Sequence, residues 1–161
     1  MIVETSNTRH PRGAAEPGRG APPTSAAPES APTGRGFDIL EVVKDDLRVV
    51  RLESGQVLFS EGDAATCMYV LKSGRLRIRS GSVVYEDVAP GGIVGEMGLV
   101  EDHQPRSAMV YALAESELVE IDDARFSELI ARTPRFALTV MQVLSRRLRA
   151  MDRRYRPDPR V

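Results

Sequence analysis

The chain has 161 residues and a formal net charge of −1, with 42% hydrophobic and 28% charged residues. This length and composition fit one globular domain, and the small net charge excludes a surface that attracts polyanions over its whole extent. The single cysteine, Cys67, excludes an internal disulfide framework, and no apolar run reaches the roughly 20 residues that a membrane span needs. We therefore expect a cytoplasmic protein without membrane contact.

Residues 1–36 differ in composition from the rest of the chain. Proline and glycine make up 11 of these 36 residues, and the first aromatic residue is Phe37. Such a segment cannot bury enough apolar surface to offset the entropy lost on ordering. We expect a disordered Pro/Gly/Ala-rich tail over residues 1–36 and one folded domain over residues 37–161.

Hydrophobic spacing predicts a short helix and then a series of strands. Phe37, Leu40, Val43 and Leu47 recur three or four residues apart, which is the helical pattern. Seven short runs rich in Val, Ile, Leu and Tyr follow, separated by turns: VVRL, QVLF, MYVL, RLRIR, SVVYEDV, SAMVYAL and ELVEI. Many short strands at regular spacing are typical of antiparallel barrels and sandwiches. We expect a mainly β fold, an antiparallel β-barrel or jelly roll (double-stranded β-helix), with a short N-terminal helix and two C-terminal helices.

The two C-terminal helices have recognisable starting residues. Asp122 and Asp123 are suitable N-caps for the first helix, and Thr133 before Pro134 is suitable for the second, over residues 134–155. The apolar residues of the second helix step by three and four: Ala137, Val140, Leu144, Leu148, Met151 and Tyr155. Helices pair through such narrow seams. We expect that this seam forms a homodimer or, alternatively, that it lies on the protein's own barrel.

The segment GEMGLVEDHQPRSA, residues 95–108, brings the chemistry of an anion site together. A helical turn over residues 96–100 would point free N–H groups at one spot, where an anion is stabilised. Gly95 allows close approach of the backbone to a ligand, and Arg106 can bind an anionic oxygen by charge-assisted hydrogen bonds. Glu96 would repel that anion, so it suits a sugar hydroxyl instead. The segment therefore predicts a site for a compact sugar phosphate.

The same residues resemble a known family. G-E-M-G-L followed by P-R-S-A closely resembles the phosphate-binding cassette of cyclic nucleotide-binding domains, especially those of the bacterial catabolite activator (Crp/Fnr-like) superfamily. The resemblance extends over residues 37–155, through S-G-Q-V-L-F-S-E-G-D, P-G-G-I-V-G-E and the helix ending S-R-R-L. It implies that Glu96 accepts the ribose 2′-hydroxyl and that Arg106 pairs with the cyclic phosphate.

The resemblance also implies the rest of the ligand site. The Ser107 hydroxyl and the Ala108 amide would complete the phosphate cradle beside Gly95, and the amides of Glu96 and Met97 would add donors. Serine at position 107 leans toward cAMP rather than cGMP as the ligand. The base would be covered by the long helix, where Met151 and Asp152 replace the family's small hydroxyl residues.

Several functions follow from this resemblance. The chain ends at Val161, where the family's helix-turn-helix would begin, so we expect a stand-alone cyclic nucleotide-binding regulatory sensor that acts in trans on an unknown effector protein. One alternative is a nucleotide-independent protein-interaction module of the same fold, in which Glu96 and Arg106 form only a structural ion pair. Another is a relative of the transcription regulators that has lost its DNA-binding domain.

Catalysis, metal binding and DNA binding have weak support in the sequence. The chain has only two histidines, His10 and His103, too few for a cupin-type metal site, and we expect His103 on a solvated turn. No nucleophile–base motif is visible. Residues 146–161 carry seven arginines, but no helix that reads bases accompanies them. We expect no enzyme activity, no metal, no cofactor besides the nucleotide, and no DNA partner.

Overall fold

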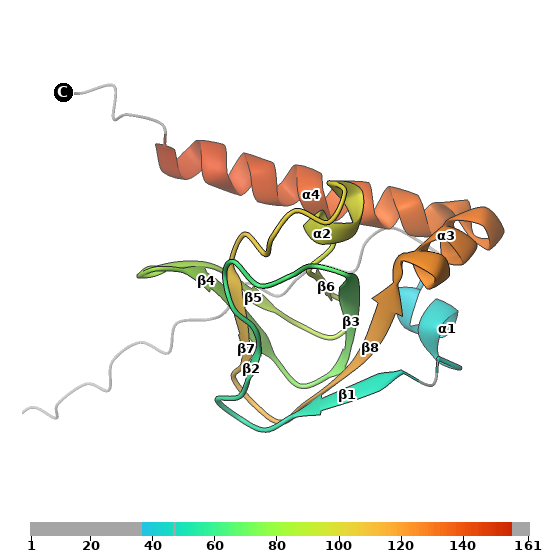
Figure 1. The fold of residues 1–161 in the computed structure, drawn as a ribbon, viewed down its shortest axis with the longest axis horizontal. Helices are drawn as coiled ribbons and strands as arrows, with labels where there is room; N and C mark the ends of the chain where they lie inside the picture. The colour runs from blue at the N-terminus through green and yellow to red at the C-terminus, as the bar shows by residue number, and fades with distance from the viewer. Residues whose placement is uncertain (1–36, 47, 156–161) are drawn as a thin grey trace, which may run out of the picture.

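Strands form the body of the domain, and helices lie along one side of it and at one end (Figure 1). The computed structural model describes residues 37–46 and 48–155. The tail expected over residues 1–36 lies outside these residues, as do Leu47 and residues 156–161. Among the described helices, none is long and apolar enough to cross a membrane.

Eight antiparallel strands form two four-stranded sheets, with the orders β1-β8-β3-β6 and β2-β7-β4-β5. The strands are β1 (Val49–Leu52), β2 (Val57–Phe59), β3 (Cys67–Ser73), β4 (Leu76–Ser80), β5 (Val83–Val88), β6 (Ile93–Val94), β7 (Met109–Ala112) and β8 (Ser116–Asp122). The mainly β jelly-roll prediction is confirmed. The barrel alternative is wrong, because the two sheets pack face to face without closing into one hydrogen-bonded cylinder in the described part of the chain.

Four helices flank the sheets: α1 (Ile39–Val43), α2 (Met97–Val100), α3 (Asp123–Arg132) and α4 (Pro134–Tyr155). Asp122 caps α3, because its carboxylate accepts the backbone N–H of Arg125 at 2.9 Å. Thr133 serves as the C-cap of α3, and its carbonyl accepts the N–H of Phe136 in the first turn of α4. The chain therefore turns from α3 into α4 within one residue.

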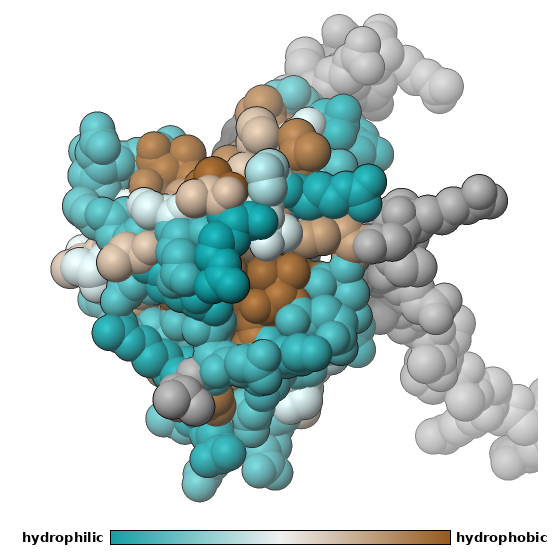
Figure 2. All heavy atoms as spheres, turned by 90° about the vertical axis from the view of Figure 1, so that its right-hand side faces the viewer, coloured by the Kyte–Doolittle hydropathy of each residue, from teal (hydrophilic) through white to brown (hydrophobic). Residues whose placement is uncertain are grey.

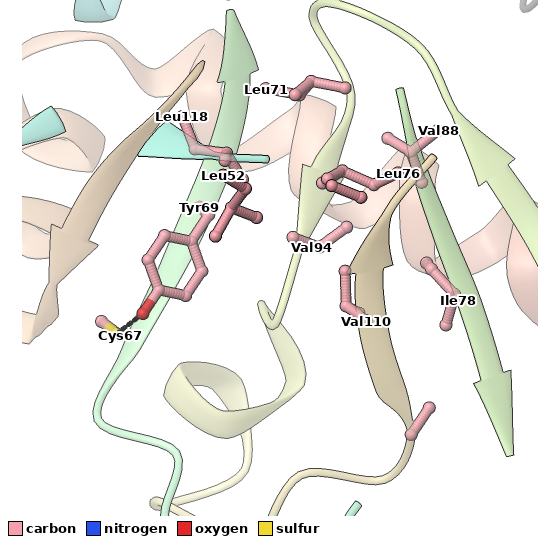
Figure 3. Packing of buried hydrophobic residues seen from close by; sticks show 12 residues of the cluster. Leu52, Cys67, Tyr69, Leu71, Leu76, Ile78, Val88, Val94, Val110 and Leu118 are labelled. Carbon is pink, nitrogen blue, oxygen red and sulfur yellow. Dashed lines mark hydrogen bonds between the residues drawn. The ribbon is translucent and has the colours of Figure 1, made fainter. Parts of the chain in front are cut away.

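Strand β3 joins two hydrophobic clusters because it is buried on both faces. Its alternate side chains Tyr69 and Leu71 enter the cluster between the two sheets, which Figure 3 shows. Met68 and Val70 point the opposite way, as the two-residue period of a strand requires, and pack against the helices. Phe136, which has no exposed surface, fixes the start of α4 in this second cluster.

The apolar seam expected on α4 is divided between two environments. Val140 is buried and Leu144 is partly buried in the helix cluster, so this half lies on the protein's own sheet. Leu148 is 61% exposed. Four large apolar side chains of α4, which we call the α4 stripe, are exposed: Leu138, Met141, Leu148 and Met151.

Strand β6 is the one strand of the described chain that the hydrophobic pattern did not predict. It has only two residues, Ile93 and Val94, both buried and paired with Val70 and Tyr69 of β3. Two residues are too few to show a strand period. Their position matters because the cassette starts directly after them, so β6 ties its entry to the centre of the first sheet.

The face of the domain at α1 and α3 is mostly polar (Figure 2). Figure 2 views the molecule from the side of α1 and α3, and hydrophilic side chains cover most of that face, with apolar ones in separate groups.

In Figure 1, α4 crosses above α2 and continues toward the end of the domain that holds β4 and β5. This course brings the second half of α4 over the cassette.

Candidate functional site

The cassette begins at Gly95, whose conformation is possible only because it lacks a side chain. Its φ is +78°, in the left-handed region that favours glycine. A Cβ at this position would clash with Nη1 of Arg106, which donates to the Gly95 carbonyl at 2.9 Å. Gly95 therefore lets the backbone and the guanidinium approach each other.

Arg106 is held in a buried and mostly apolar setting. Its residue is 6% exposed, and its guanidinium carbon lies 4.2 Å from the centre of the Phe59 ring. Nη2 is 3.6 Å from the sulfur of Cys67, whereas Nε is buried and has no partner among the described residues. Because a buried donor without a partner costs free energy, this cation retains unused capacity to bind an anion.

The backbone on both sides of Arg106 is anchored to the loop after β2. Its N–H donates to the Asp63 carbonyl at 2.9 Å, and its carbonyl accepts the N–H of Gly62 at 2.8 Å. The position of the guanidinium is therefore set before any ligand binds. Such preorganisation lowers the entropic cost of binding.

Glu96 is the second buried charge, with only 1% of its surface exposed. Its Oε1 accepts a hydrogen bond from Nη1 of Arg147 at 2.6 Å, while Oε2 is buried and has no partner in the part of the chain that the structure describes. Arg147 comes from α4 and also donates to Glu86 Oε2 and to the Ile93 carbonyl, both at 2.8 Å. Burial lowers the pKa of Arg147, but the attraction of Glu96 and Glu86 outweighs it and raises that pKa overall.

Glu96 and Arg106 do not form an ion pair in the described structure, contrary to the interaction-module alternative. Glu96 pairs with Arg147, and the side chain of Arg106 contacts the Gly95 carbonyl, the Cys67 sulfur and the Phe59 ring. The sequence patterns did not indicate that Arg147 pairs with Glu96 or that the Phe59 ring lies against Arg106. The run S-R-R-L contained a signal for Arg147, but spacing alone could not show which of its arginines turns inward.

These groups border one pocket of about 390 Å³, within the range of small-molecule sites. Seven of the residues expected to bind a ligand line it: Gly95, Glu96, Met97, Arg106, Ser107, Ala108 and Met151. Asp152, expected to cover the base, does not line it. Its neighbour Arg153 does, together with Arg146, Arg147, Ala150 and Arg154 of the same helix.

The remaining polar residues around the cassette support its shape. The short helical turn expected after Gly95 is present as α2, where the Glu96 carbonyl accepts the N–H groups of Leu99 and Val100 at 3.1 Å. His103 is half exposed, and its Nδ1 lies 3.1 Å from the Ala65 carbonyl. The described residues contain no cluster of three or more metal-ligating side chains.

Comparison with known proteins identifies the class that this fold and site define. The family model for the cyclic nucleotide-binding domain matches residues 49–133. This stretch is more than half of the chain and contains the whole cassette. The protein therefore belongs to the cyclic nucleotide-binding domain family, a class of regulatory rather than catalytic domains.

Three similar proteins show where such a domain occurs. Acetyltransferase Pat of Mycolicibacterium smegmatis is 32% identical over 122 residues, 73% of this chain and 36% of that protein. The catabolite activator protein of Thermus thermophilus has a TM-score of 0.62 and 28% identity, covering 71% of this chain and 55% of that one. The c-di-GMP-responsive regulator CLP of Xanthomonas campestris has a TM-score of 0.64 and 26% identity, covering 71% and 60%. The matched region is between 7% and 36% of the length of the curated relatives.

Proposed function

We propose that the pocket binds a 3′,5′-cyclic purine nucleotide, with its phosphate at Arg106 and its ribose 2′-hydroxyl at Glu96. The proposal rests on two opposite charges that line one pocket. Both residues are at least nine-tenths buried, and each retains a polar atom that has no partner among the described residues. A cyclic phosphate would supply the missing acceptor for Arg106. A ribose hydroxyl would supply the missing donor for Glu96.

Ligand binding would be transmitted through α4. Arg147 of this helix already occupies Oε1 of Glu96, so a ribose hydroxyl bound to the same carboxylate changes the contacts of the helix. A ligand shifts an equilibrium only through such differential contacts. We propose that the domain is a regulatory sensor, and that α4 transmits the change to an effector protein in trans.

The same helix, α4, supports a proposal for the oligomeric state. The α4 stripe exposes four large apolar side chains on one helix, at steps of three and seven residues, which matches the repeat of a two-helix seam. We propose that a second copy of the chain covers the stripe in a homodimer. In that arrangement each sensor would act on the orientation of its partner through the paired helices.

Thermal melting with nucleotides tests the proposed function. A ligand at 100 times its dissociation constant adds about 2.7 kcal/mol to the free energy of unfolding, so millimolar cAMP or cGMP should raise the melting temperature. The 2′-deoxy analogues should raise it less, because they lack the hydroxyl that Glu96 accepts. If both nucleotides leave the melt unchanged, the protein is not a cyclic nucleotide sensor.

A further inference from the structure

The face of α4 over the pocket carries arginines on both sides of a small residue. Ala150 lines the pocket. Arg146 and Arg147 lie four and three residues before it, and Arg153 and Arg154 lie three and four residues after it. Residues at these spacings share one face of a helix. The small side chain of Ala150 leaves room beneath the helix, and guanidinium groups surround that space.

Two of these arginines bind the protein through more than one nitrogen. Arg147 binds Glu96, Glu86 and the Ile93 carbonyl through all three of its nitrogens. Arg154 donates to the carbonyl groups of Val84 at 2.8 Å and Tyr85 at 3.0 Å. Its guanidinium carbon also lies 5.7 Å from the centre of the Tyr85 ring. These contacts fasten both ends of the α4 segment over the pocket.

The other two arginines keep donors for a ligand. Within residues 37–46 and 48–155, the side chain of Arg146 has no hydrogen-bond or ion-pair partner, and Arg153 uses only Nε, toward the Arg149 carbonyl at 3.2 Å. A guanidinium offers five N–H donors and no acceptor. Since the pocket-lining residues of α4 are arginines, Ala150 and Met151, the helix presents no oxygen acceptor to the pocket.

The contacts of Arg147 and Arg154 relate these donors to the parts of the proposed ligand. Arg147 marks the ribose position because it contacts Glu96, and seven residues later Arg154 contacts Tyr85. Between these two points the helix faces the apolar wall formed by Ile78, Tyr85 and Val110. A planar base that extends from the ribose would lie between this wall and Ala150, with its edge toward Arg153 or Arg146.

We propose that Arg146 and Arg153 select guanine over adenine, so that the ligand is cGMP. This inference rests on the proposed function and deepens it by naming the base. Guanine presents two acceptors, O6 and N7, on one edge, whereas adenine presents the N7 acceptor beside an amino donor. Arginine therefore pairs with guanine through two hydrogen bonds, while the amino group of adenine would face the N–H donors of these arginines on α4.

The base preference runs against the expectation from Ser107. That hydroxyl lies 3.4 Å from the Met97 sulfur, within the cassette, and it leans toward cAMP only by resemblance. The arginines would contact the base itself, where the two nucleotides differ in hydrogen-bonding groups. We therefore give the direct contact more weight than the contact near the phosphate.

Calorimetric titration of the full chain with cGMP and cAMP tests the proposal. We expect cGMP to bind more tightly by roughly five- to a hundredfold, the discrimination that one bidentate arginine–guanine pair provides. Cyclic 7-deaza-GMP, which lacks the N7 acceptor, should bind more weakly than cGMP. Cyclic IMP, which keeps O6 and N7 but lacks the 2-amino group, should bind nearly as well as cGMP.

Substitutions on α4 locate the effect. The double variant Arg146→Gln/Arg153→Gln should lose the preference for cGMP or reverse it, because glutamine pairs with adenine N6 and N7. Arg149→Gln is the matched control, because it removes the same charge from the same helix but Arg149 does not line the pocket. It should leave the cGMP-to-cAMP ratio unchanged. The single variant Arg153→Gln provides the same measurement if the double variant fails to fold.

Four results would overturn this proposal. Equal losses of cGMP and cAMP affinity in the double variant would show that the arginines act only by charge. Tighter binding of cyclic di-GMP than of cGMP, lost in the double variant, would assign them to a second phosphate. Stronger binding of cAMP than of cGMP would reject the guanine preference but leave the proposed sensor function intact, whereas failure of every nucleotide to bind would reject both.

Discussion

Arg147 and Glu96 lie 51 residues apart in the sequence, and their side chains meet at 2.6 Å where α4 covers the cassette. Glu96 is almost completely buried, and Arg147 supplies its charged partner in the described structure. A carboxylate that is buried without a partner is strongly destabilising. The pair therefore fixes α4 to the pocket, and the proposed contact of Glu96 with a ribose hydroxyl would act on the helix through it.

Arg147→Met should destabilise the ligand-free protein by about 3 kcal/mol, because it leaves Glu96 buried and unpaired. Adding Glu96→Gln should recover part of this loss, since a neutral amide costs less to bury. Urea denaturation of both single variants and the double variant measures the coupling. Additive effects of the two substitutions would show that the pair contributes no coupling to stability.

Gly95→Ala should weaken cyclic nucleotide binding at least tenfold, because the new Cβ would displace the guanidinium of Arg106. Gly55→Ala is the control for backbone strain. Gly55 has a similar φ of +86°, but no atom lies within 4 Å of the Cβ that alanine would add. Both variants should melt at lower temperature, and only Gly95→Ala should lose affinity in a titration. Equal affinities in the two variants would contradict a role for the Gly95–Arg106 approach.

Arg106→Met should abolish most ligand affinity while it keeps much of the packing on Phe59. The loss of a charge-assisted bond to the phosphate corresponds to about 1.5–3 kcal/mol of binding free energy. Arg106→Ala should in addition lower stability, because Arg106 is buried and alanine would leave a void. Calorimetry and thermal melting of both variants separate the two effects, and normal affinity of Arg106→Met would place the phosphate elsewhere.

Leu148→Glu should dissociate the proposed homodimer, because it puts a charge into the α4 stripe. Val83→Glu is the matched control: Val83 is 46% exposed but belongs to β5 and not to the stripe. Light scattering across protein concentrations should show a dimer for the parent and for Val83→Glu, and a monomer for Leu148→Glu. A parent protein that is monomeric at high concentration would refute the dimer.

Asp122 should make stability depend on acidity. The N–H of Arg125 and then the charge of Arg48 lower the pKa of Asp122 below its ordinary value of 3.8. A lowered pKa in the folded state contributes stability that is complete above the unfolded pKa and is lost as the pH falls through the folded one. Asp122→Asn keeps a capping oxygen but should remove this part of the acid sensitivity. Chemical denaturation between pH 6 and 3, as rough limits around the unfolded pKa, would detect the flatter profile; an unchanged profile would rule out this role.

Local patterns in the sequence determined the cassette and the fold class. Glu96, Arg106 and Ser107 are three residues expected to bind the ligand, and they lie within one short segment between strands. The sequence alone therefore indicates a sugar-phosphate site. Alternation of apolar residues likewise predicts most strands, because side chains of a strand with one buried face follow a two-residue period. The turn from Thr133 into Pro134 predicts the start of α4 by its backbone chemistry.

Only the tertiary structure decided which of these residues face one another. The hydrophobic pattern of α4 could not distinguish Val140, buried on the protein's own sheet, from Leu148, exposed to solvent. The family resemblance placed Asp152 over the base, whereas Arg153 lines the pocket. A single helical period fixes the spacing of residues on a face but not the angle at which that face meets the sheets. That angle is set by the packing of Phe136 and by the ion pair between Arg147 and Glu96, which join segments distant in the chain.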